Sequence, residues 1–151
     1  MPVFIAHRGN IHGAEPEFEN RRDYMEEALS CGFGVECDVQ IHNGALYFGH
    51  DEPQDQADYD FLRRPYVFCH AKTVETMVVL LNSGTHCFWH EKDQLTLTSQ
   101  GFMWCYPGIY PVNQRAIWLD LEGAETPQIK DTDIFGVCGD NYANIKWSKN
   151  K

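Results

Sequence analysis

Short apolar runs and strictly alternating stretches dominate the first half of the chain. Val3 to Ala6 is continuously apolar, and from Gly34 to Ile41 apolar residues occupy every second position, which predicts two β-strands. Asn43-Gly44 then predicts a two-residue hairpin turn into a further strand over residues 45–49. Another apolar run, Tyr66 to Cys69, predicts the next strand along the chain.

Helical periodicity interrupts these strands twice. The spacing predicts a helix from Glu17 to Cys31 that ends at Gly32. Thr73 can cap a second helix that Gly84 closes. The expected apolar face of the first helix is Phe18, Tyr24, Met25, Ala28 and Leu29, and that of the second is Val74, Met77, Val78 and Leu81.

Later strands are expected over residues 86–89, 102–105, 116–121 and 134–138, joined by connections too short or too polar for full helices. At 151 residues the chain is long enough for one domain, but a (β/α)8 barrel typically needs about 250 residues. We therefore expect a single α/β domain over residues 1–151, a reduced (β/α)8-type barrel with few helices in its second half.

Composition limits the partners of this chain. A net charge of −10 and a pI near 5.0 argue against nucleic acid as the main partner. No apolar run reaches the roughly 20 residues of a membrane span, and the N-terminus has no signal-peptide pattern, so we expect a cytoplasmic protein. Five of the six cysteines lie inside apolar strand-like runs, which favours reduced, buried thiols over disulfides.

The strongest candidate for chemistry is a pair of carboxylates. Glu36 and Asp38 are two residues apart on a predicted strand, so they share one face about 7 Å apart. Two like charges facing a barrel interior require a cation, and oxygen ligands suit Mg²⁺, Ca²⁺ or Mn²⁺. A solvent-exposed strand face is the simpler explanation of this spacing. His7 and His50 at neighbouring strand ends favour the metal site instead.

Two histidines and two cations complete the candidate site. His7 and His50 could serve as the general base and the general acid, because the unperturbed pKa of a histidine lies near neutrality. Arg8 offers a planar fork that matches phosphate oxygens, and Lys72 adds a second positive charge. The alternative for each cation is surface solvation or a structural ion pair.

The order of these motifs resembles the glycerophosphodiester phosphodiesterase family. The resemblance rests on His7-Arg8-Gly9, Glu19-Asn20, Glu36 with Asp38, and His50-Asp51, and it is specific only in the first half of the chain. It implies catalytic roles for His7 and His50, with Glu19, Asn20 and Asp51 in support. The family has a metal-binding glutamate where this chain has His70, two residues before Lys72. Either His70 binds the metal, with a preference shifted toward Mn²⁺, or the site has two carboxylates plus water.

The resemblance implies a metal-dependent phosphodiester hydrolase acting on a small phosphodiester. Two alternatives stay open: a catalytically weak protein that binds a phosphorylated ligand on the same fold, and a lyase resembling sphingomyelinase D. Missing outer helices would leave apolar strand faces uncovered, so we also expect a homodimer. The segment from His90 to Asp93 could line the pocket or be a solvated loop, and we interpret Asp120 and Glu122 as structural.

Overall fold

The computed structural model describes residues 1–142, except for the side chains of residues 126 and 127. Its strands are β1 (Val3–His7), β2 (Gly34–His42), β3 (Ala45–Phe48), β4 (Val67–Ala71), β5 (Cys87–Phe88), β6 (Leu95–Leu97), β7 (Met103–Cys105), β8 (Ala116–Leu119) and β9 (Gly136–Gly139). Its helices are α1 (Arg22–Ser30), α2 (Tyr59–Leu62), α3 (Val74–Asn82) and α4 (Thr126–Ile129).

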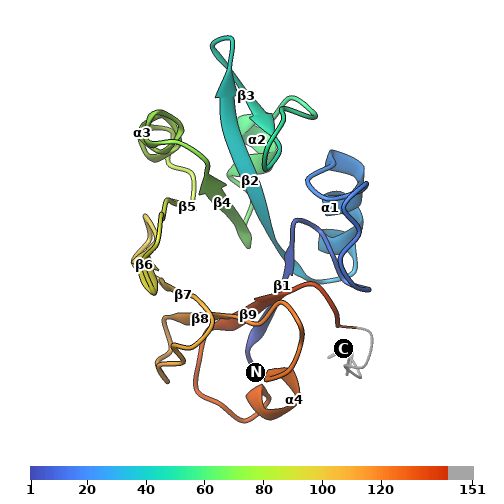
Figure 1. Cartoon of the computed structure of the whole chain (residues 1–151), viewed down its shortest axis with the longest axis vertical. Helices are drawn as coiled ribbons and strands as arrows, with labels where there is room; N and C mark the ends of the chain where they lie inside the picture. Colours follow the sequence, from blue (N-terminus) through green and yellow to red (C-terminus); the bar gives the residue numbers. More distant parts are fainter. Residues whose placement is uncertain (143–151) are drawn as a thin grey trace.

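Eight strands form a barrel-shaped sheet in the order β5-β4-β2-β1-β9-β8-β7-β6, and β3 pairs with β2 outside this path. Neighbours are parallel from β5 to β7, whereas β6 and β3 each pair antiparallel with one partner. Figure 1 shows these strands arranged in a ring. The ring nearly closes between β5 and β6, where the Ser99 N–H donates to the Cys87 carbonyl at 2.8 Å. The predicted α/β class is therefore confirmed, as a nearly closed barrel with few helices.

Two apolar clusters lie on opposite faces of this sheet. Alternate strand residues such as Ile5, Phe88 and Trp104 fill the interior with large buried side chains. Their sequence neighbours, for example Ala6 and Cys87, belong to the outer cluster beneath the helices. Beneath the carboxyl ends of the strands, the interior is therefore closely packed with large apolar side chains.

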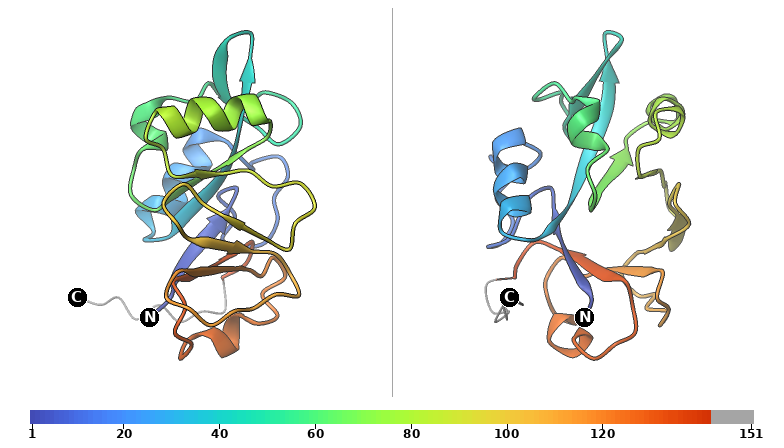
Figure 2. Two further views of the ribbon diagram at one scale, coloured as in Figure 1. Left: turned by 90° about the vertical axis from the view of Figure 1, so that its left-hand side faces the viewer. Right: turned by 180° about the vertical axis from the view of Figure 1, so that it is seen from behind.

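The helices cover only part of the outer wall. Helix α1 packs against β2, α2 against β4, and α3 against β2, β4 and β5. Figure 2 shows these three helices beside the first strands, while the strands of the second half have α4 as their helix. This matches the expected loss of helices in the second half. None of the helices among residues 1–142 has the length and apolar character to cross a membrane.

The predicted start of the first helix is wrong by five residues, because α1 begins at Arg22 rather than Glu17. Asn20 has a left-handed φ of 63° and Arg21 is extended, so the chain cannot be helical there. Phe18 consequently lies outside the helix and is 42% exposed instead of packing on its apolar face.

The predicted apolar face of α3 is wrong for three of its four residues, and only Met77 packs against the core. Val74, Val78 and Leu81 are 52–59% exposed, while Leu80 and Thr76 are buried. The Thr76 hydroxyl accepts a hydrogen bond from the Ile41 N–H at 3.1 Å, which ties this side of the helix to β2. The hydrogen bond of Thr76 therefore helps to set which side of α3 faces the sheet, although the apolar residues Val74, Val78 and Leu81 lie on the exposed side. The predicted homodimer, which could cover such residues, stays a prediction.

Other expectations hold in detail. The turn at Asn43 and Gly44 has positive φ at both residues, as the predicted hairpin requires. All six cysteines are free, and five are buried. Asp120 accepts hydrogen bonds from the backbone N–H groups of Ala124 and Glu125, which supports its structural interpretation. Strand β6 was not predicted, and β9 begins two residues later than expected.

Candidate metal and phosphate site

The barrel brings three potential metal ligands together at the carboxyl ends of β2 and β4. Glu36, Asp38 and His70 each offer a ligand atom, and these atoms lie within 4.8 Å of one another. The register pairs Asp38 with His70 on adjacent parallel strands, so both side chains face the same side of the sheet. Both carboxylates are almost fully buried, with side-chain exposures of 3% and 1%. The predicted pair is thus an interior pair, not a solvated strand face.

Asp38 is the most heavily contacted residue of this group. Its carboxylate lies 2.9 Å from Arg8 Nε, 3.4 Å from Lys72 Nζ and 3.4 Å from His70 Nδ1. The Asn20 side chain holds it from a fourth direction: its Nδ2 donates to Oδ2, and its Oδ1 accepts from the Asp38 N–H, both at 2.9 Å. The structure therefore joins the predicted residues Arg8, Asn20 and Lys72 around Asp38.

Arg8 adopts a backbone conformation that is unusual for a residue with a side chain, with φ of 54°. Its N–H donates to the Glu36 carbonyl at 2.9 Å, and its Nη1 donates to Glu19 at 3.0 Å. Gly9 follows at φ 90°, where an added Cβ would lie 2.8 Å from the Tyr24 ring. The His-Arg-Gly motif is thus a tight turn that aims Arg8 at the carboxylates, and strained turns of this kind cluster at functional sites.

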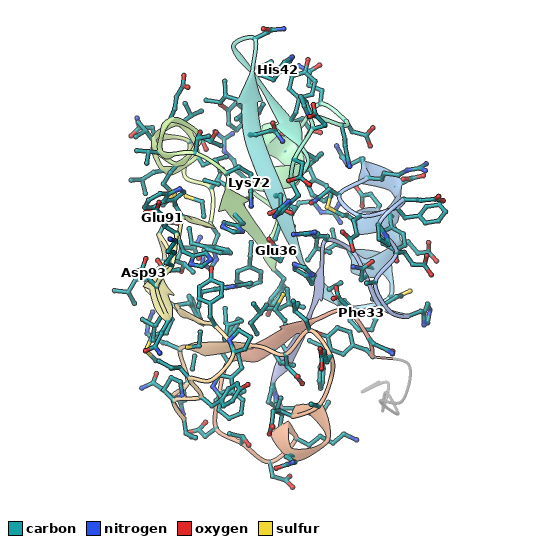
Figure 3. The ribbon with its side chains drawn as sticks, viewed as in Figure 1. Phe33, Glu36, His42, Lys72, Glu91 and Asp93 are labelled. Carbon is teal, nitrogen blue, oxygen red and sulfur yellow. The ribbon has the colours of Figure 1, made fainter. Side chains whose placement is uncertain are left out.

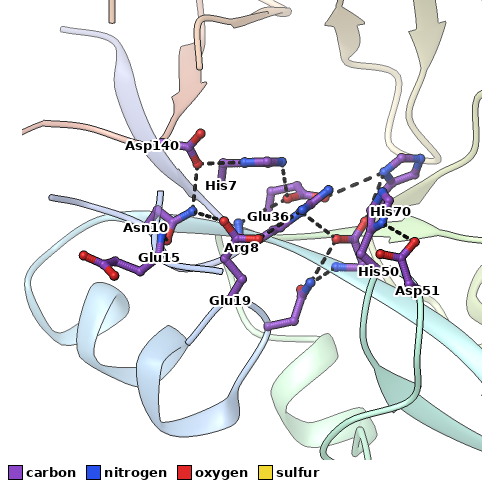
Figure 4. Close-up of polar contacts among 12 residues, drawn as sticks. His7, Arg8, Asn10, Glu15, Glu19, Glu36, His50, Asp51, His70 and Asp140 are labelled. Carbon is purple, nitrogen blue, oxygen red and sulfur yellow. Dashed lines mark hydrogen bonds and ion pairs between the residues drawn. The ribbon is translucent and has the colours of Figure 1, made fainter. Parts of the chain in front are cut away.

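His7 and Asp140 form a pair between the first and last strands of the chain. The His7 Nδ1–H donates to Asp140 Oδ1 at 2.8 Å, which leaves Nε2 directed toward Glu36 at 3.8 Å. Asn10 Nδ2 donates to the same Asp140 oxygen at 2.8 Å and to Glu19 at 3.0 Å. Figure 4 shows this chain of contacts. Sequence reasoning missed Asp140 and Asn10 as site residues, although Asp140 lies only two residues after the strand predicted over residues 134–138.

Burial and neighbouring charges shift the pKa values of the two buried carboxyl groups, Glu36 and Asp38, in opposite directions. Burial and the charge of Asp38 raise the pKa of Glu36 above its usual value. Burial would also raise the pKa of Asp38, but the His70 hydrogen bond and the charges of Arg8 and Lys72 lower it well below the ordinary range. Asp38 is therefore ionised. The positive charges near Glu36 do not offset burial and the charge of Asp38, which raise its pKa.

The pKa of His7 is raised by its partners. Burial acts to lower it, but the Asp140 hydrogen bond and the charge of Glu36 outweigh that effect. A histidine with a fixed tautomer and a raised pKa can hold a proton on its other nitrogen, which in His7 faces Glu36.

His50 is not part of this network. Its Nδ1 pairs with Asp51 at 3.0 Å, and the two side chains are 41% and 88% exposed. Within residues 1–142, no hydrogen bond or ion pair joins either residue to the Glu36 and Asp38 cluster. The structure therefore brings most of the predicted site residues together and leaves His50 and Asp51 at the exposed edge.

The donor set fits a divalent cation. The described network contains the carboxyl groups of Glu19, Glu36, Asp38 and Asp140, and the permanent cations Arg8 and Lys72. With neutral histidines this leaves a deficit of two positive charges, which one divalent ion would supply. Two carboxylates with one imidazole suit Mg²⁺ or Mn²⁺, with His70 favouring the latter.

Figure 3 shows Glu36 and Lys72 toward the middle of the ring of strands, and Glu91 and Asp93 beside β5 and β6. His90 lies two residues after β5, and Tyr106 directly follows β7. Their rings stack with centroids 3.7 Å apart, and the His90 ring lies 5.7 Å from that of His70. Residues 90–93 were predicted either to line the pocket or to form a solvated loop. His90 lines the interior of the barrel.

No protein-family model matches this chain, and no curated protein or solved structure matches it. The function must therefore be argued from the geometry of the site and from the motif order.

Proposed function

We propose that this protein is a metal-dependent phosphodiester hydrolase, similar to the glycerophosphodiester phosphodiesterases, on a reduced (β/α)8-type barrel. The observation that carries the proposal is the meeting of Glu36, Asp38 and His70 at the strand ends, where their ligand atoms lie within 4.8 Å. Active sites of parallel barrels occupy this end of the sheet. The order of the His-Arg-Gly, Glu-Asn, Glu-x-Asp and His-Asp motifs along the chain supports the same family.

Glu36, Asp38 and His70 would hold Mg²⁺, Ca²⁺ or Mn²⁺. A divalent ion at such a site polarises a phosphoryl oxygen and lowers the pKa of a bound hydroxyl. Arg8 and Lys72 lie against Asp38 at 2.9 Å and 3.4 Å, so their remaining N–H groups can bind the other phosphate oxygens. Their charges would stabilise the negative charge that develops as the phosphorus–oxygen bond breaks.

His7 is the proposed proton acceptor from the attacking hydroxyl. Asp140 holds its Nδ1–H at 2.8 Å, so the free Nε2 is the atom that takes the proton. His50, which is 41% exposed, is the proposed donor to the leaving alcohol at the rim of the barrel.

A second candidate is a protein that binds a phosphorylated ligand without turnover. Two observations favour it: Asp38 is already paired with Arg8 and Lys72, and His50 makes its contact with Asp51 instead of the cluster. Such a protein would use the same cations to bind phosphate and would need neither histidine for a reaction.

The experiment is hydrolysis of bis(4-nitrophenyl) phosphate by metal-stripped protein, with Mg²⁺, Ca²⁺ or Mn²⁺ added back. We expect metal-dependent release of nitrophenol that falls by about 10²–10⁴-fold in His7→Ala, the range typical of a lost general base. His42→Ala, at an exposed position on the β2–β3 hairpin, is the matched control and should retain full activity. Metal-independent release, or equal rates in the two variants, would contradict the hydrolase; binding of phosphate without turnover would support the second candidate.

A further inference from the structure

Three buried side-chain polar atoms of the described residues make no hydrogen bond; one of them, Arg8 Nε, still has an ion-pair partner in Asp38 at 2.9 Å, whereas the other two have none. Those two are His90 Nδ1 and the Tyr106 hydroxyl. A buried polar group without a partner costs free energy, because it has given up its bonds to water. Native proteins leave few such groups, and those at a site can be satisfied by a ligand.

The two atoms belong to one rigid unit. The His90 and Tyr106 rings stack with centroids 3.7 Å apart and planes at 23°. Below them, the Phe88 ring stacks on that of Trp104 at 4.4 Å. This packing fixes where the polar atoms point, since neither ring can turn freely within the stack.

This unit adjoins the metal and phosphate site. The His70 ring lies 5.7 Å from that of His90 and stacks on Phe88 at 4.8 Å. A ligand with its phosphate near Glu36, Asp38 and His70 would therefore extend past His70 toward His90 and Tyr106. The inference rests on this proposed phosphate site.

We propose that His90 and Tyr106 form a subsite that recognises a free hydroxyl group on the alcohol portion of the phosphodiester. A neutral tyrosine donates through its O–H, and a neutral imidazole nitrogen can accept. A substrate hydroxyl can do both at once, accepting from Tyr106 and donating to His90 Nδ1. An alkyl group would leave both atoms unsatisfied, and a quaternary ammonium group cannot hydrogen-bond to either one. The subsite therefore selects hydroxyl-bearing esters over alkyl and choline esters.

Binding of phosphomonoesters tests this without requiring turnover. The probes are 2-hydroxypropyl phosphate, propyl phosphate and choline phosphate, titrated by calorimetry into Mn²⁺-loaded protein. The first two differ by one hydroxyl group. We expect the wild-type protein to bind the hydroxypropyl ester at least about 10-fold more tightly than the propyl ester, since a site built to hydrogen-bond a hydroxyl discriminates strongly against its absence.

Tyr106→Phe keeps the ring stack and removes the donor. It should reduce the preference to about 2-fold or less while leaving the affinity for propyl phosphate unchanged. Tyr110→Phe is the matched control, because Tyr110 is 40% exposed and packs against Trp118 instead of His90. His90→Phe, which also keeps a stacked ring, is the second variant and should give the same loss if Tyr106→Phe does not fold.

The outcomes separate this inference from the proposed function. A preference for the hydroxypropyl ester that Tyr106→Phe abolishes supports the subsite even if no diester is hydrolysed. Equal wild-type affinities for the two esters, or a preference that survives both variants, would overturn the subsite even if hydrolysis occurs. Failure to bind any of the three esters would overturn the subsite and the phosphate site together.

Discussion

The His7 imidazole and the Asp140 carboxylate, 133 residues apart in sequence, are joined by a hydrogen bond of 2.8 Å between the ends of β1 and β9. The two strands are parallel neighbours, so their carboxyl ends meet at one edge of the barrel. The bond fixes the tautomer of His7 and raises its pKa. Asp140 therefore acts on the proposed reaction through His7 and is a positioning residue.

Asp140→Asn should lower kcat by about 10–100-fold, the usual cost of losing a carboxylate that orients a functional histidine. The pKa of His7 should also fall, because the variant removes a charge and a hydrogen bond that raise it. Measuring the pH profile of kcat/KM and the His7 pKa by NMR tests both effects. Asp131→Asn, at an exposed position, is the control. An unchanged His7 pKa in Asp140→Asn would rule out the positioning role.

Glu36 and Asp38 should respond oppositely to neutralisation in metal-free protein. Glu36→Gln removes a buried carboxyl group whose pKa is raised by burial and by Asp38, so the free energy of unfolding should increase by about 1 kcal/mol. Asp38→Asn removes the charged partner of Lys72 and one of the two charged partners of Arg8, and should cost about 3 kcal/mol. Urea unfolding in the presence of a chelator measures both.

The same pair reports metal binding. Mn²⁺ at 100 times its dissociation constant should stabilise the wild-type protein by about 2.7 kcal/mol and should stabilise Glu36→Gln much less. Glu122→Gln, an exposed glutamate outside the site, should respond as the wild type does. Equal stabilisation of Glu36→Gln and the wild type would exclude Glu36 as a ligand.

Asn20 combines a left-handed backbone with a structural side chain, since its φ is 63° and its amide binds Asp38 twice at 2.9 Å. Asn20→Ala and Asn20→Gly both lose these bonds, but only glycine accepts this φ without strain. We expect Asn20→Ala to be less stable than Asn20→Gly by about 1 kcal/mol, measured by urea unfolding. If the two variants were equally stable, backbone strain at this turn would be negligible.

His86 should make stability depend on pH. Burial lowers its pKa to about 4, below the value of about 6.5 expected in the unfolded chain. The unfolded state therefore binds more protons between pH 6.5 and 4, and the free energy of unfolding falls as the pH decreases through that window. Because solvent screens part of the effect, the loss should be no more than about 2 kcal/mol.

His86→Phe should remove this loss, since the ring contacts to Phe68 and Phe102 remain available to an apolar ring. The comparison is of unfolding free energies at pH 7 and pH 4, with His42→Phe on the exposed hairpin as the control. A slope in His86→Phe equal to that of the wild type would show that His86 does not contribute.

The sequence by itself determined most of the strands, the hairpin turn and the shared face of Glu36 and Asp38. Period-two alternation is a local property, so it identified β2 and placed Glu36 and Asp38 on one face before any partner strand was known. The turn at Asn43-Gly44 is equally local, because its residue types alone tolerate the required backbone angles.

Only the tertiary structure decided which strand ends meet and how the helices are rotated. The pairing of β1 with β9 joined Asp140 to His7, and the stacking of His90 on Tyr106 depends on the positions of β5 and β7 around the ring. Helix α3 exposes three residues of its predicted apolar face, Val74, Val78 and Leu81, while Thr76 binds β2. Such contacts depend on packing between distant segments, whereas alternation and turn preferences act within a few residues.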